Sequence, residues 1–70
     1  MAKNPTYAIS EVVGSSSKSI SAAIDNGIVT AAKSLRNLSW FEVTELRGHI
    51  EENKVSQYQV TLKLGFRYED

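Results

Sequence analysis

Residues 55–68 alternate between apolar and polar side chains more regularly than any other segment of the chain. Successive side chains of a β-strand point to opposite faces of a sheet, so this period of two predicts one long strand with an apolar face and a polar face. The apolar face carries Tyr58, Val60, Leu62, Leu64, Phe66 and Tyr68, and the polar face carries Gln57, Gln59, Thr61, Lys63 and Arg67. A chain that contains this strand has to cover its apolar face with another layer.

The rest of the chain predicts two more strands and one helix. Residues 6–13 alternate and predict a strand that Gly14 ends, and the serines that follow predict a turn and a helix beginning near Ser17. Apolar residues then recur three and four positions apart, which is typical of a one-sided helix, at Ile20, Ala23, Ile24, Ile28, Ala31, Leu35 and Leu38. Residues 40–50 are rich in aromatic and β-branched residues and predict a strand, which a polar turn over residues 51–54 joins to the last strand.

The order strand, helix, strand, strand predicts an α+β fold, with a βαββ protomer as one domain over residues 1–70. The hairpin makes the last two strands antiparallel neighbours, and the helix returns the chain so that the first strand lies beside the third. We therefore expect a three-stranded antiparallel sheet in the order 1-3-2, with the helix on one face. Trp40 would lie on the bare face, because Phe41 and Val43 point the other way. Gly27, inside the helix, is either a tolerated glycine or a point of close backbone approach.

Size and composition favour association between copies. A domain of 70 residues buries only about 60% of its unfolded surface. The chain has no cysteine and one histidine, which excludes disulfides, thiolate metal sites and a multi-histidine cage within one chain.

The charge of the chain points to no particular partner. Eight basic and eight acidic residues cancel, so charge supports neither a nucleic-acid nor a membrane partner. No apolar run approaches the roughly 20 residues needed to span a bilayer, and we expect a cytoplasmic protein.

Four residues are candidates for binding a flat ligand. Trp40 offers a stacking surface, although an interface tryptophan would look the same in sequence. The carboxamide of Gln59 has a donor and an acceptor that can bind the edge of a heterocycle, unless it is simply solvated. Arg47 and Arg67 can each bind a phosphate, or serve as surface charges. No arrangement of nucleophile, base or metal ligands predicts an enzyme. His49 has no serine and aspartate partners at motif spacing, and nothing in the sequence indicates an acid/base pair among the carboxylates, which are Glu11, Glu42 and Glu45.

Several segments together resemble the dodecin family. They are Glu-Val-Val-Gly-Ser-Ser at residues 11–16, Leu-Arg-Asn-Leu-Ser-Trp-Phe-Glu-Val at 35–43, Arg-Gly-His-Ile at 47–50, Tyr-Gln-Val at 58–60 and Lys-Leu-Gly-Phe-Arg at 63–67. The resemblance implies a hollow homododecamer that stores and photoprotects flavin, with FMN, riboflavin or FAD bound in pairs at two-fold interfaces. It also implies that Trp40 stacks on the isoalloxazine ring, that Gln59 bonds its pyrimidine edge, and that Arg47 and Arg67 contact the phosphate or the ring. Bacterial members of the family can also bind coenzyme A.

Two other hypotheses remain open from the residues alone. An oligomeric structural or interaction module would bury Trp40 between subunits and bind no flavin. A binder of RNA or single-stranded nucleic acid would use Trp40, Phe41 and Tyr58 as stacking surfaces. The zero net charge counts against the second of these, because phosphate contacts need basic side chains.

Overall fold

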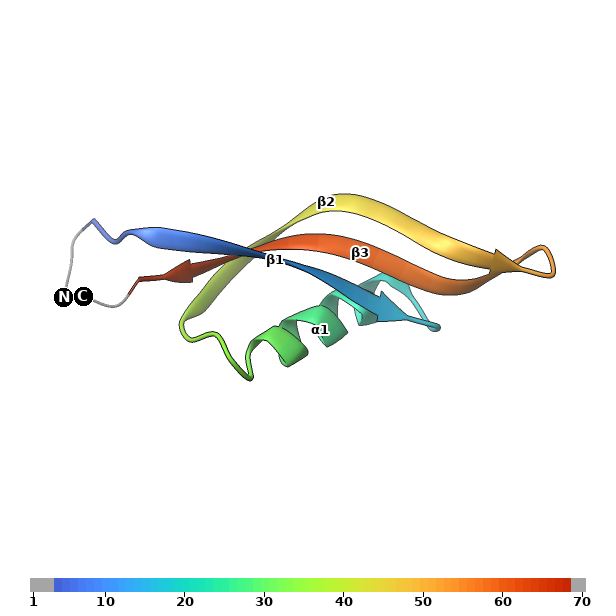
Figure 1. The fold of residues 1–70 in the computed structure, drawn as a ribbon, viewed down its shortest axis with the longest axis horizontal. Helices are drawn as coiled ribbons and strands as arrows, with labels where there is room; N and C mark the ends of the chain where they lie inside the picture. The colour runs from blue at the N-terminus through green and yellow to red at the C-terminus, as the bar shows by residue number, and fades with distance from the viewer. Residues whose placement is uncertain (1–3, 69–70) are drawn as a thin grey trace.

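The computed structural model describes residues 4–68, and its elements follow the predicted order (Figure 1). They are β1 (Tyr7–Ser16), α1 (Ile20–Ala31), β2 (Leu38–Glu51) and β3 (Lys54–Arg67). The strands form one antiparallel sheet in the order β1-β3-β2. The α+β fold class, the βαββ order and the central position of β3 are therefore confirmed.

A tight turn joins β2 to β3. Glu52 and Asn53 both have positive φ angles, 53° and 64°, as the two central residues of a type I′ turn require. This turn matches the right-handed twist of the two strands and brings them straight back alongside each other. The register shifts between Leu38 and Trp40, between Val43 and Glu45, and between His49 and Ile50. Such irregularities bend a strand and increase its twist.

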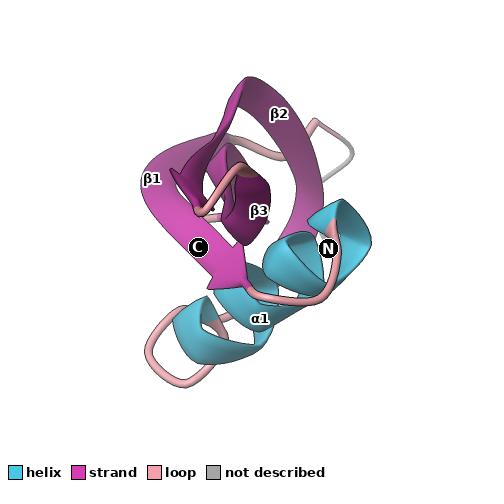
Figure 2. Cartoon of the chain, turned by 90° about the vertical axis from the view of Figure 1, so that its right-hand side faces the viewer, coloured by secondary structure: helices cyan, strands magenta, loops and turns pink. Residues whose placement is uncertain are grey.

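The helix covers only part of the sheet. It packs against β1 and β3 (Figure 2), where five apolar residues are buried: Ala23, Ala31, Val60, Leu62 and Leu64. Every residue of β2 after Leu38 is exposed. The chain presents 5296 Å² of accessible surface, whereas a compact monomer of 7.7 kDa presents about 4300 Å². The excess surface and the small core are typical of a subunit that is completed by its neighbours.

The helix begins three residues later than predicted, and β1 is correspondingly longer. Ser19 is the N-cap, and its Oγ accepts a hydrogen bond from the amide of Ala22 at 3.0 Å. Gly14, Ser15 and Ser16 continue β1 and pair with β3, so the prediction that Gly14 ends the strand is wrong. The physical reason is that the strand itself requires a glycine at the point where the helix passes close above it.

The helix also ends earlier, at Ala31 instead of Leu38. The amide of Leu35 still bonds to the carbonyl of Ala31 at 2.9 Å, which closes a turn after the helix. Leu35 and Leu38 pack against the core, so the apolar spacing continues past the point where the backbone leaves the helix. No helix among residues 4–68 is long and apolar enough to cross a membrane.

Two glycines allow the backbones of α1 and β1 to touch. A Cβ atom placed on Gly14 would lie 2.0 Å from the carbonyl oxygen of Ala23, and one placed on Gly27 would lie 3.2 Å from the Cα of Gly14. Both glycines are buried. Of the two interpretations left open for Gly27, the close backbone approach is the one that the structure supports.

Candidate functional site

All four candidate residues lie on the sheet face away from the helix, which we call the open face. Leu62 and Leu64 are buried under α1, so the alternating residues of β3, from Gln59 to Arg67, point to the opposite side. The cross-strand partner of Gln59 is Arg47 and that of Gly65 is Trp40, and paired residues share a face. The prediction that Trp40 lies on the bare side of the sheet is therefore confirmed.

The indole of Trp40 lies directly on the backbone of β3. A Cβ atom on Gly65 would come within 2.0 Å of Cε2, 2.3 Å of Cζ2 and 2.5 Å of Cδ2 of that ring. The ring of Tyr7, from β1, contacts the indole at a centroid distance of 6.5 Å and an angle of 59°. The side chain of Trp40 nevertheless remains exposed, with 41% of its surface accessible. One side of the indole is thus supported by the sheet, while much of its surface is available for contact.

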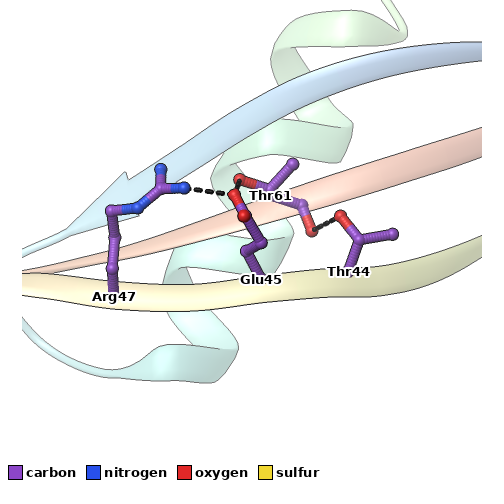
Figure 3. A network of polar contacts seen from close by, with 4 residues as sticks. All are labelled: Thr44, Glu45, Arg47 and Thr61. Atoms are coloured by element: carbon purple, nitrogen blue, oxygen red, sulfur yellow. Dashed lines mark hydrogen bonds and ion pairs between the residues drawn. The ribbon is translucent and has the colours of Figure 1, made fainter.

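Arg47 and Gln59 form a second, polar group on the open face. Arg47 Nη2 donates to Glu45 Oε1, and the hydroxyl of Thr61 donates to the same oxygen at 3.5 Å (Figure 3). A hydrogen bond of 3.4 Å from Thr44 Oγ1 to the carbonyl of Thr61 ties β2 to β3 beside this group. A guanidinium has five N–H donors, and the bond to Glu45 orients it with donors to spare for an anionic or carbonyl ligand.

Arg67 lies at the same end of the sheet as Trp40, two residues beyond Gly65. Its backbone is held by Asn37, whose carbonyl accepts from the Arg67 amide at 3.1 Å and whose side-chain amide donates to the Arg67 carbonyl at 3.3 Å. Asn37 can do this because it adopts a left-handed conformation with φ of 62°, which asparagine tolerates better than most residues. The loop before β2 therefore fixes the end of β3.

The candidate residues fall into two separate groups within one chain. Trp40 pairs with Gly65, which is six residues along β3 from Gln59, a separation of about 20 Å at the rise of an extended strand. Three fused six-membered rings are shorter than this. One chain therefore brings Arg47 to Gln59, and Arg67 to the Trp40 end, but does not bring Trp40 and Gln59 to a single ring system.

Two residues of the site cannot be recognised from the sequence alone. Tyr7 and Gly65 both contact or support Trp40, yet neither stands near it in sequence. A glycine within a strand does signal a close approach, but the partner becomes visible only once the register of β2 and β3 is known. Among residues 4–68, no group of three or more histidine and carboxylate side chains could hold a metal ion.

A second exposed apolar surface lies on β2, on the same face of the sheet as the helix, where the helix packs against β1 and β3 instead. Phe41, Val43 and Leu46 pair with the buried residues of β3 but are themselves exposed. Near the hairpin, a hollow is lined mainly by Ile20, Leu46, Ile50, Val55 and Tyr58. An apolar surface of this extent on a small chain indicates contact with another protein surface.

Comparisons with known proteins all lead to one family. The family model described as Dodecin matches residues 6–69. The dodecin of Thermus thermophilus is 50% identical over 60 residues, which cover 86% of this chain and 87% of that protein. Among solved structures, the dodecin from Streptomyces coelicolor superposes with a TM-score of 0.92 at 48% identity and covers 99% of both chains. The dodecin from Streptomyces davaonensis also gives a TM-score of 0.92, at 43% identity, over 97% of this chain and 100% of its own.

Proposed function

Because the chain belongs to the dodecin family, we propose that it binds flavin and stores it in a homododecamer without catalysing a reaction. The proposed ligand is FMN or riboflavin, with FAD as a larger relative. In this proposal Trp40 stacks on the isoalloxazine ring and Gln59 bonds the pyrimidine edge. Arg47 and Arg67 contact the phosphate or the ring.

The observation that carries this proposal is the half-exposed indole on the open face. An exposed tryptophan supported on one side by backbone is a rigid stacking surface with little side-chain freedom left to lose. Flat, electron-poor rings stack favourably on the electron-rich face of an indole. An isoalloxazine is such a ring, and its pyrimidine edge has the alternating donors and acceptors that a carboxamide complements.

The separation of the two groups on the open face supports a site shared by two copies. A two-fold axis between facing copies makes an isologous contact, in which residue i of one meets residue j of the other and the reverse. Such an axis can bring Trp40 of one copy beside Gln59 of its partner, and the same symmetry produces a second, identical site from the other two side chains. Two flavins per pair of chains, and one per protomer, follow from this symmetry.

The proposed role is sequestration of a photoreactive molecule. A tryptophan stacked on an excited flavin can quench it by electron transfer, so the stored ligand would be kept dark. Stacking, edge bonding and charge neutralisation are all binding interactions that leave the ligand chemically unchanged. The proposal therefore includes no substrate and no turnover.

A titration of ligand-free protein with FMN tests the proposal. We expect the emission of Trp40 and of the flavin to fall together to an endpoint near one flavin per chain, in particles whose mass by light scattering is about twelve chains. Unchanged emission in particles of that mass would reject flavin binding and leave an assembly module, for which coenzyme A is then the ligand to try. Binding of RNA that weakens steeply with salt would instead favour a nucleic-acid role.

The two arginines are expected to distinguish FMN from riboflavin. Hydrogen bonds to charged groups contribute about 1.5 to 3 kcal/mol, so Arg47→Ala or Arg67→Ala should weaken FMN binding about tenfold for whichever arginine contacts the phosphate. Riboflavin, which has no phosphate, should be affected less than twofold by that variant. Lys33→Ala removes an exposed positive charge from the chain after α1 and serves as the control. Equal loss for both ligands would instead assign the arginine to the ring.

A further inference from the structure

Gly65 supports the face of the Trp40 indole, not its edge. The three indole atoms nearest to a Cβ atom placed on Gly65 are Cε2, Cζ2 and Cδ2, at 2.0, 2.3 and 2.5 Å. Cζ2 and Cδ2 are two of the three ring atoms bonded to Cε2, and a point in the ring plane outside the edge cannot lie at such similar distances from all three of the atoms measured. These distances put the added atom above the ring, almost over Cε2. The indole therefore lies flat over the Cα of Gly65, with its opposite face turned away from the sheet.

Any side chain at residue 65 would raise the indole. Carbon atoms in contact prefer a separation of about 3.5 to 4.0 Å, whereas a Cβ atom on Gly65 would lie only 2.0 Å from the ring. A methyl group would therefore lift the ring by roughly 1.5 Å to reach even the lower of those separations. The ring is also in contact with Tyr7 from β1, at a centroid distance of 6.5 Å, so displacing it would disturb that contact as well.

We propose that Gly65 is a positioning residue for flavin, and that the absence of a side chain there sets the height of the Trp40 stacking face above the sheet. This inference rests on the proposed function, because it concerns the depth of the proposed flavin site. A ligand stacked on the outer face of the indole occupies the space between that face and whatever lies opposite. The height of the indole above the sheet decides how much of that space is left.

The effect doubles where two copies face each other across a two-fold axis. Lifting each of the two indoles by roughly 1.5 Å narrows the gap between them by roughly 3 Å, nearly the 3.5 Å contact thickness of one aromatic layer. A gap that accommodates stacked flavins would then lose almost one layer. Gly65 therefore matters more in the shared site than the contact in a single chain indicates.

Gly65→Ala tests this inference in the complete assembly. Stacking of a ring on an aromatic side chain contributes about 5- to 150-fold to affinity, and we expect the variant to bind FMN at least tenfold more weakly than the wild type in a fluorescence titration. The near-ultraviolet circular dichroism of Trp40 in the ligand-free protein should change as well, because the indole leaves its fixed position. Gly27→Ala is the matched control, since it adds the same methyl group at a buried glycine on the helix side and should alter neither reading.

Combining Gly65→Ala with Trp40→Ala tests the contact between residue 65 and the indole without any ligand, at one fixed protomer concentration. Gly65→Ala should lower the thermal midpoint when Trp40 is present, but it should leave the midpoint of Trp40→Ala unchanged or raised, because there is then no indole to displace. If the effects of the two substitutions on the thermal midpoint simply add, residue 65 and the indole do not interact and the inference is wrong.

The outcomes for the inference and for the proposed function can be told apart. If the wild type binds FMN and Gly65→Ala binds it equally well, the positioning role is wrong while the proposed function stands. If the wild type binds no flavin, the proposed function is wrong, and the circular dichroism and the double substitution still decide whether Gly65 positions Trp40.

Discussion

Replacing Trp40 with alanine is expected to weaken FMN binding by about 5- to 150-fold, which corresponds to the 1 to 3 kcal/mol contributed by stacking on an aromatic side chain. Among the residues that the structure describes, the indole of Trp40 is the aromatic ring that lies on the backbone of β3 at Gly65. Alanine removes that surface and leaves Gln59 and the arginines in place. Quenching of flavin emission, followed during a titration at fixed salt, measures the change.

Trp40→Phe is the matched variant for this prediction. A phenyl ring keeps a stacking face of smaller area, so its FMN affinity should fall between those of the wild type and the alanine variant. Light scattering on all three proteins should give the same mass. Equal affinity in all three would disprove stacking, and smaller particles for Trp40→Ala would show that the indole holds subunits together.

Local patterns in the sequence were enough to predict most of the fold, and the alternation in the last strand is the clearest of them. The side chains of Val60, Leu62 and Leu64 are buried as the pattern requires, and the period of two in β3 determines which residues share the open face with Gln59. The polar residues at Glu52 and Asn53 marked the hairpin. These are local properties, since a side chain's face and a turn's geometry depend on a few neighbouring residues.

The helix boundaries could not be predicted because they depend on contacts between distant segments. Gly14 looks like the end of a strand when only its neighbours are considered. It remains in β1 because Ala23 and Gly27 of the helix lie against it. Leu35 looks helical because it packs on the same core as the helix, although its backbone has already left the helix.

The four candidate residues could be named from the sequence, but their arrangement could not. The exposed position of Trp40 follows from alternation in one strand. The support from Gly65 and the contact with Tyr7 follow from the pairing of three strands. The distance between Trp40 and Gln59 likewise depends on the register of β2 and β3, which pairs Trp40 with Gly65. No property of a single segment indicates that two copies are needed to bring these side chains together.

Gly14→Ala is expected to destabilise the protein by about 3 kcal/mol, at the upper end of the range for overpacked sites. The added Cβ would lie 2.0 Å from the carbonyl oxygen of Ala23, 3.0 Å from its carbon and 3.1 Å from the amide nitrogen of Gly27. All three are backbone atoms of the helix, so no side chain can rotate away to make room. A carbonyl at this position bonds to the amide four residues later, and moving it would strain that bond or shift the whole helix off β1.

Gly27→Ala tests the same contact from the other side and should behave differently. Its Cβ would meet the Cα of Gly14 at 3.2 Å and a flexible methyl group of Leu62 at 3.2 Å, which requires shifts of only tenths of an ångström. Alanine also favours a helix over glycine by up to about 1 kcal/mol, so the two effects nearly cancel. Denaturant unfolding at one fixed protomer concentration, which an assembling protein requires, should leave Gly27→Ala within about 1 kcal/mol of the wild type. Equal losses in the two variants would show that the strand and the helix can separate more easily than their touching backbones indicate.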